Sequence, residues 1–212
     1  MLMDRSSELM AGGSPEVSRI RPLPPKEWPP EMRDALEAMM PPEPRHPRPI
    51  SKDRPGSRNT LGAFAYHPAL SRAFMTFLGH ILMATTLSER QRELIVMRVA
   101  TRRQSGYLWA QHVFMALDAG LSDDEISRIA YGPKAPFWLP IDAAILSAVD
   151  ELIDDGAIEQ ATWDALSDSL TTEQLLDLIF TVGTYEITAW MMRSLDLEID
   201  EDIPLLFAPR LG

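Results

Sequence analysis

The spacing of apolar residues predicts helices along the whole chain from residue 61 onward. The segment 67–87 carries apolar side chains at intervals of three and four residues, the pattern of one helix face: Leu70, Phe74, Phe77, Leu78 and Ile81. Further helices are predicted at 88–103, 105–119, 141–154, 160–169 and 172–195. Polar and apolar residues nowhere alternate in the manner of a strand. The chain is therefore predicted to be all-α.

Three of the predicted helices begin with the same capping signal. Each start has a leucine, then a serine or threonine, and then a Glu or Gln three residues after the hydroxyl: Leu87-Ser88-x-x-Gln91, Leu121-Ser122-x-x-Glu125 and Leu170-Thr171-x-x-Gln174. In such a box the hydroxyl and the longer side chain each satisfy a free backbone N–H, and the leucine packs against the first turn. Gly120 suits the left-handed position that ends the preceding helix.

The N-terminal part of the chain is rich in proline. Twelve of the eighteen prolines precede residue 61, and proline both lacks a backbone donor and restricts the residue before it. We therefore expect a mostly irregular arm over 1–55, with one short helix from Pro30 to Met40, ahead of an all-α domain over 56–212. We expect the first fifteen or so residues to be disordered. The arm should wrap over its own or a neighbouring subunit, anchored by Ile20, Leu23 and Trp28.

Composition and charge narrow the function class. At 212 residues and 45% hydrophobic content, the chain suits one globular core. The net charge of −11 argues against nucleic acid, and the region 122–202 holds nineteen Asp and Glu against three Lys and Arg. We interpret this acidity as a solvated surface and not as a site for a cationic partner. No signal peptide or membrane span is apparent, so we expect a cytoplasmic protein without a membrane partner.

The chain contains no cysteine. This excludes disulfides, thiolate metal sites and thiol catalysis. The four histidines, His46, His67, His80 and His112, show no close metal-ligand spacing, and no phosphate loop or dinucleotide fingerprint is present. We therefore expect neither a metal nor a cofactor. A site assembled from His80, His112 and Glu93 is the metal alternative that the sequence leaves open.

Glu93 and His112 are the strongest candidates for chemistry. His112 shares a predicted helix face with three apolar residues, Trp109, Val113 and Ala116, so it should point inward. Glu93 lies among apolar residues of the preceding helix, where an unpaired carboxylate would be costly. A turn at 104–106 can fold the two helices together. The pair would then serve either as an acid–base centre or as a structural tie between two core helices.

Several ordered motifs resemble one known family. Leu-Ser-x-Arg-x-Arg-Glu-Leu at 87–94 is followed by Tyr-x-Trp-Ala-x-His at 107–112 and Ala-Gly-Leu-Ser-Asp-x-Glu-Ile at 119–126. This order resembles the carboxymuconolactone decarboxylase family, whose superfamily includes the AhpD-type peroxidase partners. The resemblance spans roughly residues 56–203. It implies an AhpD-like helical bundle that assembles as a homo-oligomer, a trimer or hexamer, with a dimer as a further option.

The resemblance also indicates which chemistry is missing. Peroxidase-type relatives carry two cysteines between the glutamate and the histidine, and these positions are Ser105 and Leu108 here. Serine forms no redox disulfide, and its hydroxyl is not acidic enough to be a resting nucleophile. Thiol peroxidase activity is therefore disfavoured.

The decarboxylase branch does not require cysteine, and it implies a cofactor-independent lyase or isomerase. Its substrate would be a small carboxylated or lactone-type molecule. His112 would then be the general acid or base and Glu93 its orienting partner, with His80 as a second candidate that is otherwise a core histidine. Binding roles would fall to Trp109, Tyr107, Tyr185 and Arg98. The alternative is a non-catalytic helical oligomer of the same family that binds a ligand or partner.

Overall fold

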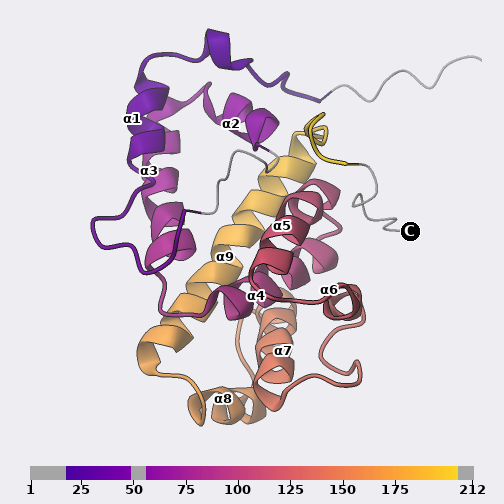
Figure 1. Ribbon diagram of the computed structural model, residues 1–212. Coiled ribbons are helices and arrows are strands. Elements are labelled where there is room, and N and C mark those ends of the chain that lie inside the picture. Colours follow the sequence, from indigo (N-terminus) through magenta and orange to yellow (C-terminus); the bar gives the residue numbers. More distant parts are fainter. Residues whose placement is uncertain (1–17, 49–55, 205–212) are drawn as a thin grey trace, which may run out of the picture.

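The computed structural model describes residues 18–48 and 56–204, and within these ranges the chain is all-α, as predicted, with no strand (Figure 1). The α-helices are α1 Glu31–Glu37, α2 Arg58–Phe64, α3 Pro68–Gly79, α4 Glu89–Arg102, α5 Gly106–Asp118, α6 Asp123–Ile129, α7 Pro140–Asp154, α8 Gln160–Ser167 and α9 Thr172–Ser194. A short 3-10 helix, η1, spans Pro25–Glu27, and a π-helix, η2, spans His80–Ala84. The first fifteen residues, expected to be disordered, lie outside the described residues.

Helix α4 is the centre of the molecule. It packs against α5, α7 and α9, which surround it in Figure 1. Every residue from Arg92 to Ala100 is buried, so α4 has no solvent-facing side over this stretch. A helix that is buried all round must pair its polar side chains inside the protein. Glu93 and Arg98 are therefore both held by polar partners inside the protein, Glu93 by Arg92 and His112 and Arg98 by Asp150.

The three predicted capping boxes are confirmed. The side-chain oxygens of Ser88, Ser122 and Thr171 each accept a hydrogen bond from the backbone N–H three residues later, and the backbone N–H of each donates in return to the side chain of that later residue. The stapling residues Leu87, Leu121 and Leu170 are all buried. Gly120 has φ +86°, the left-handed conformation expected for it. These local signals place the starts of α4, α6 and α9 correctly.

The proline-rich arm packs on its own protomer and contributes to a second apolar cluster. Its helix is shorter than predicted, Glu31–Glu37, and it lies against α3 (Figure 1). Three arm side chains are buried in this cluster: Met32, Ala35 and Met39. Of the expected anchors, Leu23 and Trp28 pack against the cluster, whereas Ile20 remains 42% exposed.

Two glycines allow the arm to approach the helical domain closely. The carbonyl oxygen of Met39 lies 2.0 Å from the position that a Cβ at Gly79 would occupy, and that of Leu23 lies 2.5 Å from a Cβ at Gly62. Any larger residue would push the arm away. The arm is therefore seated on α2 and α3 by backbone contact, including a hydrogen bond from Leu23 N to Gly62 O of 3.1 Å.

Candidate functional site

The structure brings Glu93 of α4 and His112 of α5 into direct contact. His112 Nδ1 donates to Glu93 Oε2 at 2.8 Å, because a carboxylate can only accept. Glu93 is fully buried and His112 is only 6% exposed. The short turn between α4 and α5 makes the two helices neighbours, and this positions the pair. The bond fixes the tautomer of the neutral imidazole with its proton on Nδ1.

Arg92 completes this cluster, and we refer to Arg92, Glu93 and His112 as the site triad. Arg92 Nε donates to Glu93 Oε1 at 2.9 Å, and its Nη1 donates to Leu82 O at 2.7 Å. Burial acts to raise the pKa of the Glu93 carboxyl, but the neighbouring His112 and Arg92 lower it overall below its ordinary value. Glu93 is therefore a buried carboxylate with both oxygens occupied.

The π-helix η2 supplies the acceptor for Arg92. It spans His80–Ala84, where the ordinary i to i−4 bonding of an α-helix is interrupted. Leu82 O is thereby directed at the buried guanidinium. A role for Arg92 beside Glu93 is not predictable from the sequence, because adjacent residues on a helix normally point in different directions.

A cavity of about 320 Å³ lies on the open side of His112. Its walls are mostly apolar and come from the arm, α2, α3, η2, α5 and α9: Leu36, Met39, Leu61, Phe64, Phe74, Met75, Leu78, Leu82, Leu108, Phe114, Met115 and Met192. His112 lines this cavity, and its Nε2 makes no hydrogen bond with any described residue. One nitrogen of the imidazole is thus anchored and the other is available to a ligand.

Tyr185 of α9 lies beside the imidazole. Its ring meets that of His112 edge to face, with 5.0 Å between the centroids. Burial, followed by the nearby Glu93 charge, raises the pKa of the Tyr185 hydroxyl, so the group remains a neutral donor. The hydroxyl has no hydrogen-bond partner among the described residues, and Tyr185 lines the same cavity.

Polar groups are few elsewhere in the cavity. The Oγ1 of Thr60 is buried there without a partner in the part of the chain that the structure describes. Gln111 is held by Ser57 and Gly56. Two arginines, Arg48 and Arg58, line the cavity and are otherwise exposed. Arg58 lies 4.0 Å from Asp202, and Arg48 has no ion pair with a described residue. No motif in the sequence indicates a role for these two arginines.

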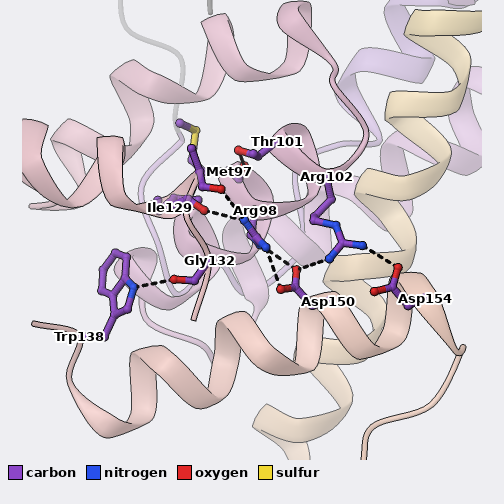
Figure 2. A network of polar contacts seen from close by, with 10 residues as sticks. Met97, Arg98, Thr101, Arg102, Ile129, Gly132, Trp138, Asp150 and Asp154 are labelled. Carbon is purple, nitrogen blue, oxygen red and sulfur yellow. Dashed lines mark hydrogen bonds and ion pairs between the residues drawn. The ribbon is translucent and has the colours of Figure 1, made fainter. Parts of the chain in front are cut away.

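Arg98, expected to hold a substrate carboxylate, is placed elsewhere. Its guanidinium donates to both Asp150 oxygens at 2.7 Å and to the carbonyls of Ile129 and Ala130 (Figure 2). Arg102 extends this cluster to Asp150 and Asp154. We call Arg98, Arg102, Asp150 and Asp154 the α4–α7 network. Arg98 does not line the cavity, because residue 98 faces α7 while residue 93 faces α5.

Two aromatic candidates also lie outside the cavity. The hydroxyl of Tyr107 donates to Asp200, and burial is the largest effect that raises its pKa, followed by the charge of Asp200. Trp109 packs against the main core and lines no part of the cavity. Neither side chain is brought to His112 in the way that Tyr185 is.

His80 forms a separate pair on the surface of the fold. Its Nε2 lies 2.9 Å from Asp177 Oδ1, and its side chain is 51% exposed, so it is neither a core histidine nor part of the cavity. Burial acts to raise the pKa of Asp177, but hydrogen bonds from Thr86 and His80 lower it overall. The His80, His112 and Glu93 alternative is not assembled. Within 18–48 and 56–204, no three His, Asp or Glu are grouped to hold a metal.

The positions that carry cysteines in peroxidase-type relatives lie next to the site. Leu108 lines the cavity and is 1% exposed, and Ser105 is equally buried. The Ser105 hydroxyl has no partner among the described residues. With an apolar side chain at one position and an alcohol at the other, this part of the site has no redox chemistry of its own.

Comparisons with known proteins bear on the helical fold of the chain. The model of the carboxymuconolactone decarboxylase family matches residues 68–151. An AhpD-core, peroxidase-related protein from Ralstonia eutropha JMP134 has a similar structure, at 18% identity and a TM-score of 0.70, covering 91% of this chain and 97% of that one. A peroxidase-related protein from Silicibacter sp. TM1040 covers 91% and 96% at 16% identity, with a TM-score of 0.69.

Debrominase Bmp8 has the same fold, at 13% identity and a TM-score of 0.68, covering 85% of this chain and 91% of that one. Comparison with curated proteins gives no match. No helix of the described residues is long and apolar enough to cross a bilayer. The family segment contains Glu93 and His112, and the neighbours share the helical architecture. This cysteine-free chain thus has an AhpD-like helical fold, and its residues 68–151 match the model of the carboxymuconolactone decarboxylase family.

Proposed function

We propose that this protein is a cofactor-independent enzyme that transfers protons on a small, carboxylated or lactone-type organic molecule, as a lyase or isomerase. One observation carries the proposal: His112 Nδ1 is held by a buried carboxylate while Nε2 is free at a cavity. A general base needs a fixed tautomer, an available lone pair and access to its substrate. The site triad provides the first two, and the cavity provides the third.

The proposed chemistry follows from the state of each group. Nε2 takes a proton from a carbon next to a carbonyl, or the imidazolium returns a proton to the carbon that has lost CO2. Glu93 stabilises the imidazolium while it exists, and Arg92 keeps Glu93 ionised. The neutral Tyr185 hydroxyl donates a hydrogen bond to the enolate oxygen that develops beside the ring.

The cavity favours a ligand with an apolar body and an anionic end. Its volume of about 320 Å³ suits a small molecule, and most of its walls offer only dispersion contacts. Among the described residues, Arg48 and Arg58 are the arginines that line this cavity, and a guanidinium binds carboxylate in a bidentate manner. The role first expected of Arg98 is therefore proposed for these two arginines.

The proposal is tested by exchange in D2O with a panel of lactone and β-keto carboxylic acids. Deuterium incorporation at carbon is followed by NMR, and CO2 release is followed in parallel. We expect at least one panel member to react, and His112→Ala to reduce its rate by about 100- to 10,000-fold. Circular dichroism should show an unchanged helix content for this variant.

His80→Ala is the matched control, because it removes the other carboxylate-paired histidine from outside the cavity. It should retain the full rate. The alternative, a non-catalytic binding protein, predicts tight binding of panel members without exchange or CO2 release. That result, or equal rates for His112→Ala and wild type, would overturn the catalytic proposal.

A further inference from the structure

Helix α9 presents an uncovered apolar face to solvent. From residue 176 to residue 190, the exposed positions of this helix are Leu176, Phe180, Gly183, Ile187 and Trp190, which we call the α9 stripe. The four side chains are 52%, 54%, 52% and 54% exposed, in chain order. None of the five carries a charge. A run of half-exposed apolar side chains without a polar residue between them marks a contact surface.

The spacing of the stripe is that of a helix–helix seam. Its members are separated by four, three, four and three residues, a repeat of 3.5. This repeat keeps one line of side chains facing a partner helix along its length. Among the described residues no helix covers the stripe beyond the edge contact of Phe180 with Phe77 of α3, because the buried positions of α9 are the ones that face α4, α5 and α7.

Gly183, at the centre of the stripe, supports a contact with another helix. A glycine in the middle of a helix costs about 1 kcal/mol relative to alanine. A Cβ at this position would meet no atom of the protomer within 4 Å, so the fold of one chain does not require the glycine. A missing side chain lets a second backbone approach closely at this point.

We propose that the α9 stripe binds a second copy of this chain, with the two α9 helices antiparallel and a two-fold axis at Gly183. Leu176 and Trp190 lie seven residues before and after Gly183, and Phe180 and Ile187 lie three before and four after. The axis therefore places Leu176 against the partner's Trp190 and Phe180 near the partner's Ile187. Each contact combines an aromatic with an aliphatic side chain. In an isologous interface both copies use the same surface, so that surface must be complementary to itself, as the stripe is.

The charges that flank the stripe favour the same arrangement. Glu173 lies ten residues before Gly183 and Arg193 ten residues after it, and both are exposed. Neither forms an ion pair with a described residue. The antiparallel pair brings Glu173 to the partner's Arg193 at both ends, whereas a parallel pair would bring like charges together.

The available area suits a stable pair. Phe77 of α3 meets Phe180 edge to face at 6.0 Å and is itself 37% exposed, so it extends the stripe. Side chains of this size and exposure offer on the order of 500 Å² of apolar surface. With a polar rim, this approaches the roughly 800 Å² per partner of standard interfaces.

Cysteine cross-linking tests the position of the axis, since the full chain contains no cysteine of its own. Under mild oxidation, Gly183→Cys should form a disulfide-linked dimer, because residue 183 alone meets its own copy. Tyr131→Cys, at a position that is 80% exposed, is the control and should remain monomeric in denaturing gels. Equal cross-linking of both variants would overturn the proposed axis.

Sedimentation equilibrium tests the stripe itself. Wild type should form assemblies with an even number of copies, and Ile187→Glu should raise the dissociation constant about 100-fold or more. Glu173→Lys or Arg193→Glu alone should weaken the assembly, and the double exchange should restore it. Circular dichroism should match wild type, since these positions are exposed. A monomeric wild type, or an assembly unaffected by Ile187→Glu, would mean that the stripe serves another partner and that the proposal is wrong.

Discussion

The site triad and the α4–α7 network are two charge clusters that share helix α4, and they differ in how many polar atoms are left without a partner. In the network, Arg98 directs Nε, Nη1 and Nη2 at oxygens of Asp150, Ile129 and Ala130, so each of its three guanidinium nitrogens has a partner (Figure 2). In the triad, both oxygens of Glu93 and the Nε and Nη1 of Arg92 are bonded inside the protein, whereas Nε2 of His112, which lines the cavity, has no partner among the described residues.

This difference separates stability from chemistry. A closed cluster satisfies its own buried charges and ties α4 to α7. An open cluster uses buried charges to hold one reactive atom at a surface. The two clusters contain similar residue types, so residue identity alone does not distinguish them. The two clusters are distinguished by the number of donor and acceptor atoms that have no partner within the protein.

The largest expected effect is a loss of folding stability when Arg98 is removed from the α4–α7 network. Arg98→Met should lower the free energy of unfolding by about 3 kcal/mol, because Asp150 would keep a partly buried negative charge with only Arg102 nearby, and the carbonyls of Ile129 and Ala130 would lose their donor. Urea unfolding at neutral pH measures this loss. Arg102→Met, at a side chain that is 28% exposed, is the control and should cost less than about 1 kcal/mol. Similar losses for both variants would show that the network is not the closed, stabilising cluster described above.

The next effect concerns the orientation of the open cluster. Glu93→Gln keeps the shape of the side chain but removes the charge that stabilises an imidazolium. We expect kcat on a reactive panel substrate to fall about 10- to 100-fold, with KM little changed because Glu93 does not line the cavity. Steady-state kinetics separates the two constants. A change in KM alone would assign Glu93 to binding and not to the imidazole.

Two buried tyrosines differ in the same respect, since the hydroxyl of one is bonded within the fold and that of the other has no described partner. Smaller changes in stability and rate are expected from their replacement. Tyr107→Phe removes the donor to Asp200 and should cost about 1–2 kcal/mol of unfolding free energy. Tyr185→Phe removes a hydroxyl without a described partner and should cost less than about 0.5 kcal/mol, while reducing kcat by up to about tenfold. If Tyr185→Phe proves the more destabilising of the two, its hydroxyl belongs to the fold and not to the open site.

The smallest expected change in stability concerns the ion pair between Arg90 and Glu125, at the edge of the core. This contact lowers the pKa of Glu125 to about 2. Because the folded pKa lies below the ordinary value, the stabilisation is present at neutral pH and is lost as pH falls from about 4.5 towards 2. Glu125→Gln should be about 1 kcal/mol less stable than wild type at pH 7. The two proteins should converge in urea midpoint near pH 2, and a constant difference across pH would exclude this ion pair as the cause.

Much of the helical framework was predictable from local signals. The caps at Ser88, Ser122 and Thr171 and the left-handed Gly120 fix element ends through bonds within a few residues. The proximity of Glu93 and His112 was also predictable, because two helices joined by a short turn are neighbours. Local chemistry and short connections are properties that a sequence displays directly.

The rest of the site depends on tertiary packing. Residues 92 to 100 of α4 are all buried, so periodicity could not say which neighbour Arg98 faces. The buried Arg92 guanidinium is oriented towards Glu93 with Leu82 O of the π-helix η2 as its second acceptor, a tertiary contact that the sequence does not display. Arg48 lies in a segment whose prolines predicted little beyond irregular structure, and its place at the cavity depends on how the arm is seated.

The seating of the arm has a consequence for how relatives diverge. Leu36, Met39 and Arg48 line the cavity, yet all three lie outside the family segment of residues 68–151. The site triad and part of the cavity wall are therefore encoded in separate stretches of the gene. Substitutions in the arm can reshape the ligand that is accepted while α4 and α5 stay unchanged. Two proteins with the same family segment can in this way have different substrates.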